Sequence, residues 1–153
     1  MKKYGKLIAL LALACALAAC ASVKNFEDVM DKEWRLVGVL VEQQYIAIDR
    51  NKTAAGGSSE IFTLRFGDGR ISGVGSPNRY FAPYSFGDQN TITIGDVAGT
   101  LMANLFEQEN FTEYEYFTWL QHAERWNVSK GNLELYAKKN DGSQAILIFV
   151  LSE

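Results

Sequence analysis

Residues 70–84 constrain the fold of this chain more than any other stretch, and they read Arg70-Ile-Ser-Gly-Val-Gly-Ser-Pro-Asn-Arg-Tyr-Phe-Ala-Pro-Tyr84. Gly73, Gly75 and Pro77 fall within five positions. Glycine at this density suits a close approach of two backbones, and proline fixes φ and removes a backbone donor. The chain is therefore predicted to leave one strand here, turn a structural corner, and enter a second strand at Asn78.

The segments around this corner have the signatures of β-strands. Residues 61–66 alternate apolar and polar side chains, residues 67–69 (Gly-Asp-Gly) favour a tight turn, and residues 70–74 alternate again, which together predict a hairpin. Residues 145–151 are almost wholly apolar, so this last strand is predicted to be central or covered on both faces. Other predicted strands are 33–41, 84–86, 91–94, 126–129 and 132–136, with 44–48 as a strand or an extended connection, and with 95–106 either extended or a short helix.

One helix start is clear from local spacing. Thr112 stands three residues before Glu115, which is the spacing of a capping box, and Phe111 and Tyr116 stand at the positions of a hydrophobic staple. The helix is predicted to continue through Ala123. The expected fold class is α+β, with a curved, mostly antiparallel sheet or partial barrel packed on one main helix.

The N-terminal segment resembles a bacterial lipoprotein signal. Three lysines precede an apolar run over residues 7–17, and Leu17-Ala-Ala-Cys20 resembles a lipobox, in which the cysteine carries the lipid. The expected organisation is a signal peptide at 1–19, a tether at 20–32 and one domain at 33–153, with Cys20 as the lipid-attachment residue. The alternatives are a secretory signal cut after Ala19 and a short transmembrane anchor.

Cysteine use and charge limit the possible chemistry. Loss of residues 1–19 removes Cys15, and the lipid would consume Cys20, so neither a disulfide framework nor thiolate chemistry is expected. The same cleavage removes three of fifteen basic residues and leaves twelve against eighteen acidic ones, a net charge of −6. A nucleic-acid partner is not expected, because such proteins need a clustered basic face.

Catalytic patterns are sparse. His122 is the single histidine, so a histidine-rich metal site is excluded, and a solvated or capping role near the helix end is expected for it. Glu113 and Glu115 are two apart and do not share a helical face. The glycines after residue 71 lead into a strand and not into a phosphate-binding helix. No enzyme activity, cofactor or metal is predicted.

The ordered set of motifs resembles the META domain family, which includes HslJ-like heat-shock lipoproteins. The matching segments are Trp34-Arg-Leu36, residues 69–73, Asn78-Arg-Tyr-Phe81, residues 100–103, residues 113–120 and Leu133-Glu-Leu135. The resemblance implies a membrane-anchored, non-enzymatic envelope lipoprotein in envelope maintenance or stress response. Pro77 and Asn104 stand where the family often has cysteines, from which we hypothesise that these two positions lie close together.

The sequence is compatible with several kinds of binding site. The corner has a second interpretation as a recognition loop, with Arg79, Tyr80 and Tyr84 as hypothetical binding residues. The aromatic excess predicts either core packing or an exposed groove. A small apolar ligand would need an aromatic-lined cavity inside the sheet, a protein partner or inhibition target would need an exposed anchor such as Arg79, and a hydrolase would need two converging carboxylates.

The residues after Cys20 bear on the membrane that would hold the lipid. Ala21 and Ser22 lack the aspartate that retains lipoproteins at the inner membrane in some bacteria. The outer membrane is therefore favoured over the inner membrane.

Overall fold

The computed structural model describes residues 26–50, 60–103 and 110–152. In chain order its elements are η1 (Phe26–Asp28), β1 (Glu33–Val41), β2 (Gln44–Ala47), β3 (Thr63–Phe66), β4 (Arg70–Val74), β5 (Arg79–Phe86), β6 (Ile92–Ile94), β7 (Ala98–Gly99), α2 (Glu113–Gln121), β8 (Ala123–Ser129), β9 (Asn132–Lys138) and β10 (Gln144–Leu151).

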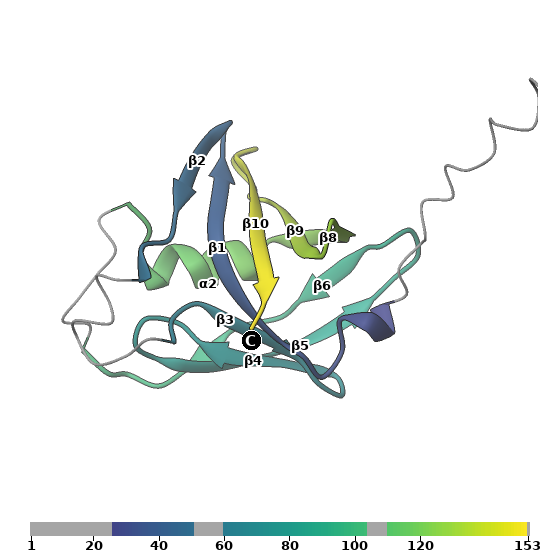
Figure 1. Cartoon of the computed structure of the whole chain (residues 1–153), viewed down its shortest axis with the longest axis horizontal. Helices are drawn as coiled ribbons and strands as arrows, with labels where there is room; N and C mark the ends of the chain where they lie inside the picture. Colours follow the sequence, from purple (N-terminus) through teal and green to yellow (C-terminus); the bar gives the residue numbers. More distant parts are fainter. Residues whose placement is uncertain (1–25, 51–59, 104–109, 153) are drawn as a thin grey trace, which may run out of the picture.

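The strands form one strongly curved antiparallel sheet (Figure 1). Its main path runs β6-β5-β4-β3-β1-β10-β9-β8, while β2 pairs with β1 and β7 pairs with β5. The two ends of the path approach each other, because Thr91 bridges to Arg125 and the Trp126 N–H donates to the Asn90 carbonyl oxygen at 3.0 Å. The result is a nearly closed barrel packed on α2, which confirms the predicted fold class.

The hairpin beside the corner has the predicted turn and return strand, but its first strand begins at Thr63 and not at residue 61, because Phe62 adopts a left-handed φ of 50°. Phe66 of β3 pairs with Ile71 of β4, and Gly69 in the turn has φ of 64°. A left-handed φ of this kind favours glycine. The bounds of β4 and β1 agree with the sequence prediction, and residues 44–47 form a strand.

The last strand, β10, is central, as predicted, between β1 and β9. Its inward residues Ala145, Leu147 and Phe149 are buried, while the outward residues Ile146 and Ile148 are only half-buried. Apolar side chains on both faces therefore reflect a covered inner face and a partly open outer face.

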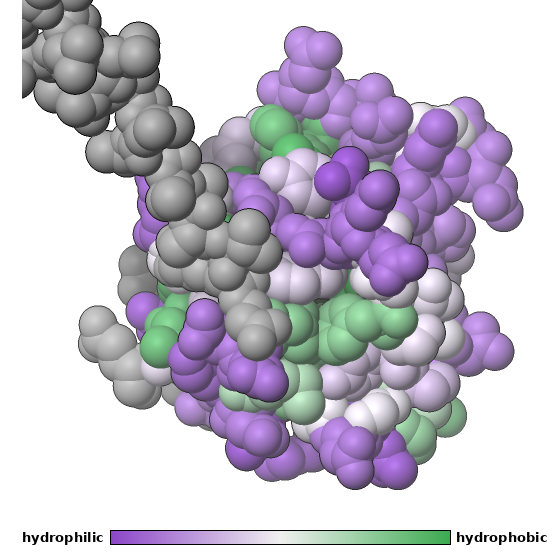
Figure 2. Space-filling model, turned by 90° about the vertical axis from the view of Figure 1, so that its right-hand side faces the viewer, coloured by the Kyte–Doolittle hydropathy of each residue, from purple (hydrophilic) through white to green (hydrophobic). Residues whose placement is uncertain are grey.

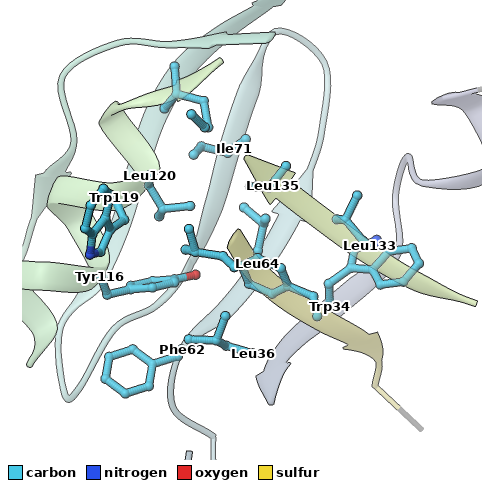
Figure 3. Packing of buried hydrophobic residues seen from close by; sticks show 14 of the residues in the cluster. Trp34, Leu36, Phe62, Leu64, Ile71, Tyr116, Trp119, Leu120, Leu133 and Leu135 are labelled. Carbon is cyan, nitrogen blue, oxygen red and sulfur yellow. The ribbon is translucent and has the colours of Figure 1, made fainter. Parts of the chain in front are cut away.

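Core side chains from the barrel and the helix fill the interior (Figure 3). Tyr116, Trp119 and Leu120 of α2 point toward the inner faces of the strands, where residues such as Leu36 and Leu64 are completely buried. A small barrel can be filled by its own side chains in this way. A ligand cavity inside the sheet, one of the expectations above, is therefore not the arrangement that the core residues adopt.

The helix begins as predicted but ends earlier. Thr112 and Glu115 form the capping box. The chain leaves the helix at His122, which has φ of −99° and ψ of 10°, and Ala123 already pairs with Ala137 as part of β8. The prediction that the helix continues through Ala123 is wrong. An apolar residue at position 123 fits the pattern of a helix and that of a strand, because its side chain would be buried in both. Only the pairing with β9 shows that Ala123 belongs to a strand.

Two opposite ends of the barrel matter for the site. The corner between β4 and β5 and the start of α2 lie on the left in Figure 1, whereas η1 lies on the right. We call these the corner end and the η1 end. The strand β5 joins them, and its first and last Cα atoms are about 23 Å apart, over seven steps of about 3.3 Å. No helix in the described ranges is both long and apolar enough to cross a membrane.

Candidate functional site

The corner is held by a carboxylate from the helix. Glu113, the first residue of α2, accepts hydrogen bonds at Oε1 from the backbone N–H groups of Ser76 (2.5 Å) and Asn78 (2.8 Å). Its Oε2 accepts a third bond from Asn78 Nδ2 at 2.7 Å. Bonds to an ionised acceptor are stronger than bonds between neutral groups. The start of the helix therefore fixes the path of the turn.

Asn78 extends this network to the segment after β7. Its Oδ1 accepts from Thr100 Oγ1 (2.8 Å) and from the Met102 N–H (2.6 Å), and its Nδ2 also donates to the Met102 carbonyl oxygen (3.2 Å). Asn78 is buried. Residues 78 and 102 are thus neighbours. The hypothesis that positions 77 and 104 lie close together stays a prediction, because Asn104 lies outside the described residues.

The glycines of the corner are required by close packing. A Cβ atom on Gly75 would lie 2.5 Å from Glu113 Oε1 and 2.8 Å from the ring of Phe117. A Cβ atom on Gly73 would collide with the Thr63 carbonyl group. The predicted close approach of backbones at this turn is confirmed, because larger residues would displace the helix or β3.

The three hypothetical binding residues do not converge. Arg79 is exposed, while Tyr80 is buried and points into the barrel. The Tyr84 hydroxyl lies towards the opposite end, where it donates to the Gly67 carbonyl oxygen at 2.8 Å. Alternation along β5 separates Arg79 from Tyr80, because neighbouring residues of a strand face opposite sides. Tyr84 shares the face of Tyr80 but lies four residues further along the strand, nearer the η1 end.

Tyr80 forms a buried polar cluster with Tyr116. The Tyr80 hydroxyl donates to the Thr63 carbonyl oxygen at 2.8 Å and lies 2.9 Å from the Tyr116 hydroxyl, which also contacts that oxygen at 3.0 Å. Burial raises the pKa of Tyr80, although the bond with Tyr116 acts in the other direction. Burial, together with the charge of Tyr80, raises the pKa of Tyr116. This cluster orders the core and is closed to a ligand.

An apolar surface surrounds the rigid corner. The side chain of Leu101 is fully exposed, and those of Met102, Phe81 and Tyr114 are largely exposed. We call these four residues and Arg79 the corner surface. Leu101 and Met102 lie directly after the Thr100 that Asn78 holds. Residues 100–103 match a family motif in the sequence. The exposure of Leu101 and Met102 could not be predicted from that motif, because it depends on contacts from distant strands.

A second feature is a hollow on the outer face of β1, β10 and β9. It has a volume of about 460 Å³. Its floor includes Leu40, Ile146 and Tyr136, which face each other across the three strands. Its rim carries charges of both signs, including Arg125 and Glu42. We call it the outer hollow.

Metal-ligating side chains are not gathered in the described part of the chain. Among residues 26–50, 60–103 and 110–152, no three His, Cys, Asp or Glu residues are placed to hold a metal ion. His122 is half-buried at the end of α2, and its Nδ1 lies 2.8 Å from the Thr118 carbonyl oxygen. This position suits the helix-end role predicted for it.

Comparisons with known proteins identify the fold and the family. A family model described as META domain matches residues 24–149. A solution structure of a protein from Burkholderia xenovorans has a TM-score of 0.60 and 23% identity, over 82% of this chain and 85% of its own. A crystal structure of a duf4847 family protein from Bacteroides vulgatus has a TM-score of 0.52 and 16% identity, over 82% of this chain and 95% of its own. At these identities the two structures show the fold alone. No curated protein matches the sequence.

Proposed function

Because the chain belongs to the META domain family, we propose that it is a non-enzymatic lipoprotein of the bacterial envelope that takes part in envelope maintenance or the stress response. Support for the anchor comes from the sequence, in which a basic segment, an apolar run and Leu17-Ala-Ala-Cys20 follow in order. Diacylglycerol on Cys20, with palmitate among the acyl chains, would hold the chain to a bilayer. The outer membrane is the proposed site.

Within this role, the domain binds a protein partner through the corner surface. The observation that supports this function is a pair of exposed apolar side chains, Leu101 and Met102, on backbone that Asn78 and Glu113 hold rigidly. A rigid apolar anchor loses little conformational entropy on binding. Arg79 beside it supplies a cation for a carboxylate on the partner.

Cross-linking from the corner tests this function. A photoreactive residue at position 101 of the full-length protein in intact cells is expected to capture one defined partner. Arg79→Ala should reduce the yield at least fivefold. Lys130→Ala, a matched change of an exposed cation in the turn after β8, should leave the yield unchanged. Equal yields from both variants, or no captured protein, would remove the corner surface as a binding site.

A second candidate function is binding of a small apolar ligand in the outer hollow. Its apolar floor and mixed polar rim are typical of ligand sites. A fluorescent apolar probe should bind the intact protein and be lost in Ile146→Glu, which places a charge on the floor. Val150→Glu, on the same outer face of β10 but away from the hollow, is the control. Equal probe binding by both variants would reject this candidate.

A further inference from the structure

The η1 end carries an aromatic cluster at the point where the described chain begins. The ring of Phe26 lies with its centroid 3.7 Å from that of Phe86, 4.8 Å from that of Trp126 and 5.0 Å from that of Phe66. The next residues also pack on the barrel, since Val29 is completely buried and its carbonyl oxygen accepts from Trp34 Nε1 at 3.1 Å. The first described residues are therefore fixed to this end.

The spacing to Cys20 limits how far this end can stand from a lipid on that residue. Phe26 follows Cys20 by six positions. Six extended residues span at most about 22 Å, at about 3.6 Å each. A lipid on Cys20 would consequently keep Phe26 within about 22 Å of the lipid, whatever conformation the intervening residues adopt.

The same end exposes apolar side chains. Phe86 is 40% exposed and Leu151 is 46% exposed. Leu151 also lines a hollow of about 350 Å³ with Trp34 and Val128. Figure 2 looks at the side of the molecule where η1 lies, and an apolar area occupies the middle of that face between hydrophilic residues. Partly exposed aromatic and aliphatic side chains of this kind suit the boundary between headgroups and acyl chains.

Charge at this end selects the kind of lipid. Glu27, Asp28 and Asp31 on and after η1 outnumber Lys32 and Arg65. Arg65 lies 3.8 Å from Asp31, and the Lys32 ammonium donates to the Asp28 carbonyl oxygen. Such a surface lacks the basic excess that attracts anionic lipids. Its apolar side chains fit a zwitterionic bilayer surface.

We propose that the η1 end is a membrane-docking face, on which Phe86 and Leu151 enter the interface of a zwitterionic bilayer. The proposal rests on the lipid anchor proposed above. It places the corner surface at the far end of β5, directed away from the membrane and open to a partner. The lipid then supplies affinity, and the docking face supplies orientation.

Depth-dependent quenching tests the orientation. The protein is expressed from its full-length sequence, purified from bacterial envelopes, and labelled at Asp88→Cys, in the turn two residues after Phe86, or at Leu101→Cys on the corner surface. It is then reconstituted in phosphatidylcholine vesicles that contain a nitroxide lipid. The label at position 88 should be quenched at least threefold more than the label at position 101. Adding phosphatidylglycerol should not increase this quenching.

Two variants and a flotation control separate the possible outcomes. Phe86→Ser with Leu151→Ser should lower quenching at position 88 to the level at position 101, while Phe81→Ser, which removes an exposed ring from the same strand, should not. Protein that floats with the vesicles but shows equal quenching at both positions would overturn the docking face and leave the anchor intact. Protein that does not float would overturn both the anchor and the docking face.

Discussion

At the scale of single residues, Glu113 connects two parts of the chain that local spacing does not relate. Its hydrogen bonds reach Asn78, which lies 35 residues earlier. Sequence reasoning placed Asn78 at the entry to a strand and Glu113 at the start of a helix, and both placements are confirmed. The contact between them could not be predicted, because it depends on how the helix crosses the barrel.

Removal of this carboxylate should destabilise the corner. Glu113→Ala leaves two backbone N–H groups and the Asn78 amide without their acceptor. Each unsatisfied group costs about 1–3 kcal/mol when water cannot replace the acceptor fully. The free energy of unfolding in urea should fall by about 3 kcal/mol. Glu124→Ala, at an exposed position, should change it by less than about 0.5 kcal/mol; similar values for both variants would contradict this role of Glu113.

The buried tyrosines predict a loss of stability in alkali. Burial raises the pKa values of Tyr80 and Tyr116 in the folded state, so above the unfolded pKa of about 10 the unfolded chain binds fewer protons than the folded one. Stability should therefore be flat below pH 9 and fall above pH 10, by about 1.4 kcal/mol per pH unit for each tyrosine. Denaturant unfolding between pH 8 and pH 11.5 measures this slope.

A tyrosine variant tests whether the Tyr80–Tyr116 cluster causes the loss of stability in alkali. Tyr80→Phe removes one ionisable group and should lower the slope by about 1.4 kcal/mol per pH unit, at a cost of about 1 kcal/mol at neutral pH for the lost hydrogen bond. Tyr114→Phe, at an exposed position, should leave the slope as it is. An unchanged slope in Tyr80→Phe would show that other groups cause the alkaline instability.

At the scale of elements, the sequence predicts best where the signal is local. The capping box of Thr112 and Glu115 and the glycine turn before β4 depend on neighbours in the chain, and both are confirmed. The predicted end of α2 is wrong, because Ala123 lies outside the helix and pairs with β9. The short strand β7 lies in residues 95–106, for which the sequence predicts either extended chain or a short helix. The sequence does not decide between the two, because the two residues of β7 are held by pairing with the distant strand β5.

The helix cap gives a prediction at this scale. The Thr112 side chain accepts from the Glu115 N–H at 3.2 Å, and Glu115 Oε2 accepts from the Thr112 N–H at 2.7 Å. Thr112→Ala removes the side-chain acceptor and should lower stability by about 1 kcal/mol. Thr118→Ala, in the same helix but away from its N-terminus, should be neutral or slightly stabilising. Equal destabilisation by both changes would mean that the cap contributes nothing specific.

At the scale of the whole molecule, the two barrel ends have different proposed roles, membrane docking and partner binding. The η1 end lies six positions after Cys20, and the corner end presents Leu101 on a rigid turn. The sequence predicted the barrel and singled out the corner, yet it named Tyr80 and Tyr84 as binding residues. Strand alternation and the closure of the barrel place Tyr80 inside and Tyr84 towards the η1 end, and neither effect is visible from residue type alone.

Mass spectrometry of the N-terminal peptide from envelope-purified protein tests the anchored arrangement most directly. A lipid-anchored protein should begin at Cys20 and carry diacylglycerol on the sulfur, and its Cys20→Ala variant should keep residues 1–19. A chain that begins at Cys20 with a free thiol would indicate an ordinary secretory signal. A wild-type chain that keeps residues 1–19 would indicate an uncleaved anchor. Either of these two results would contradict the lipid anchor and the orientation built on it.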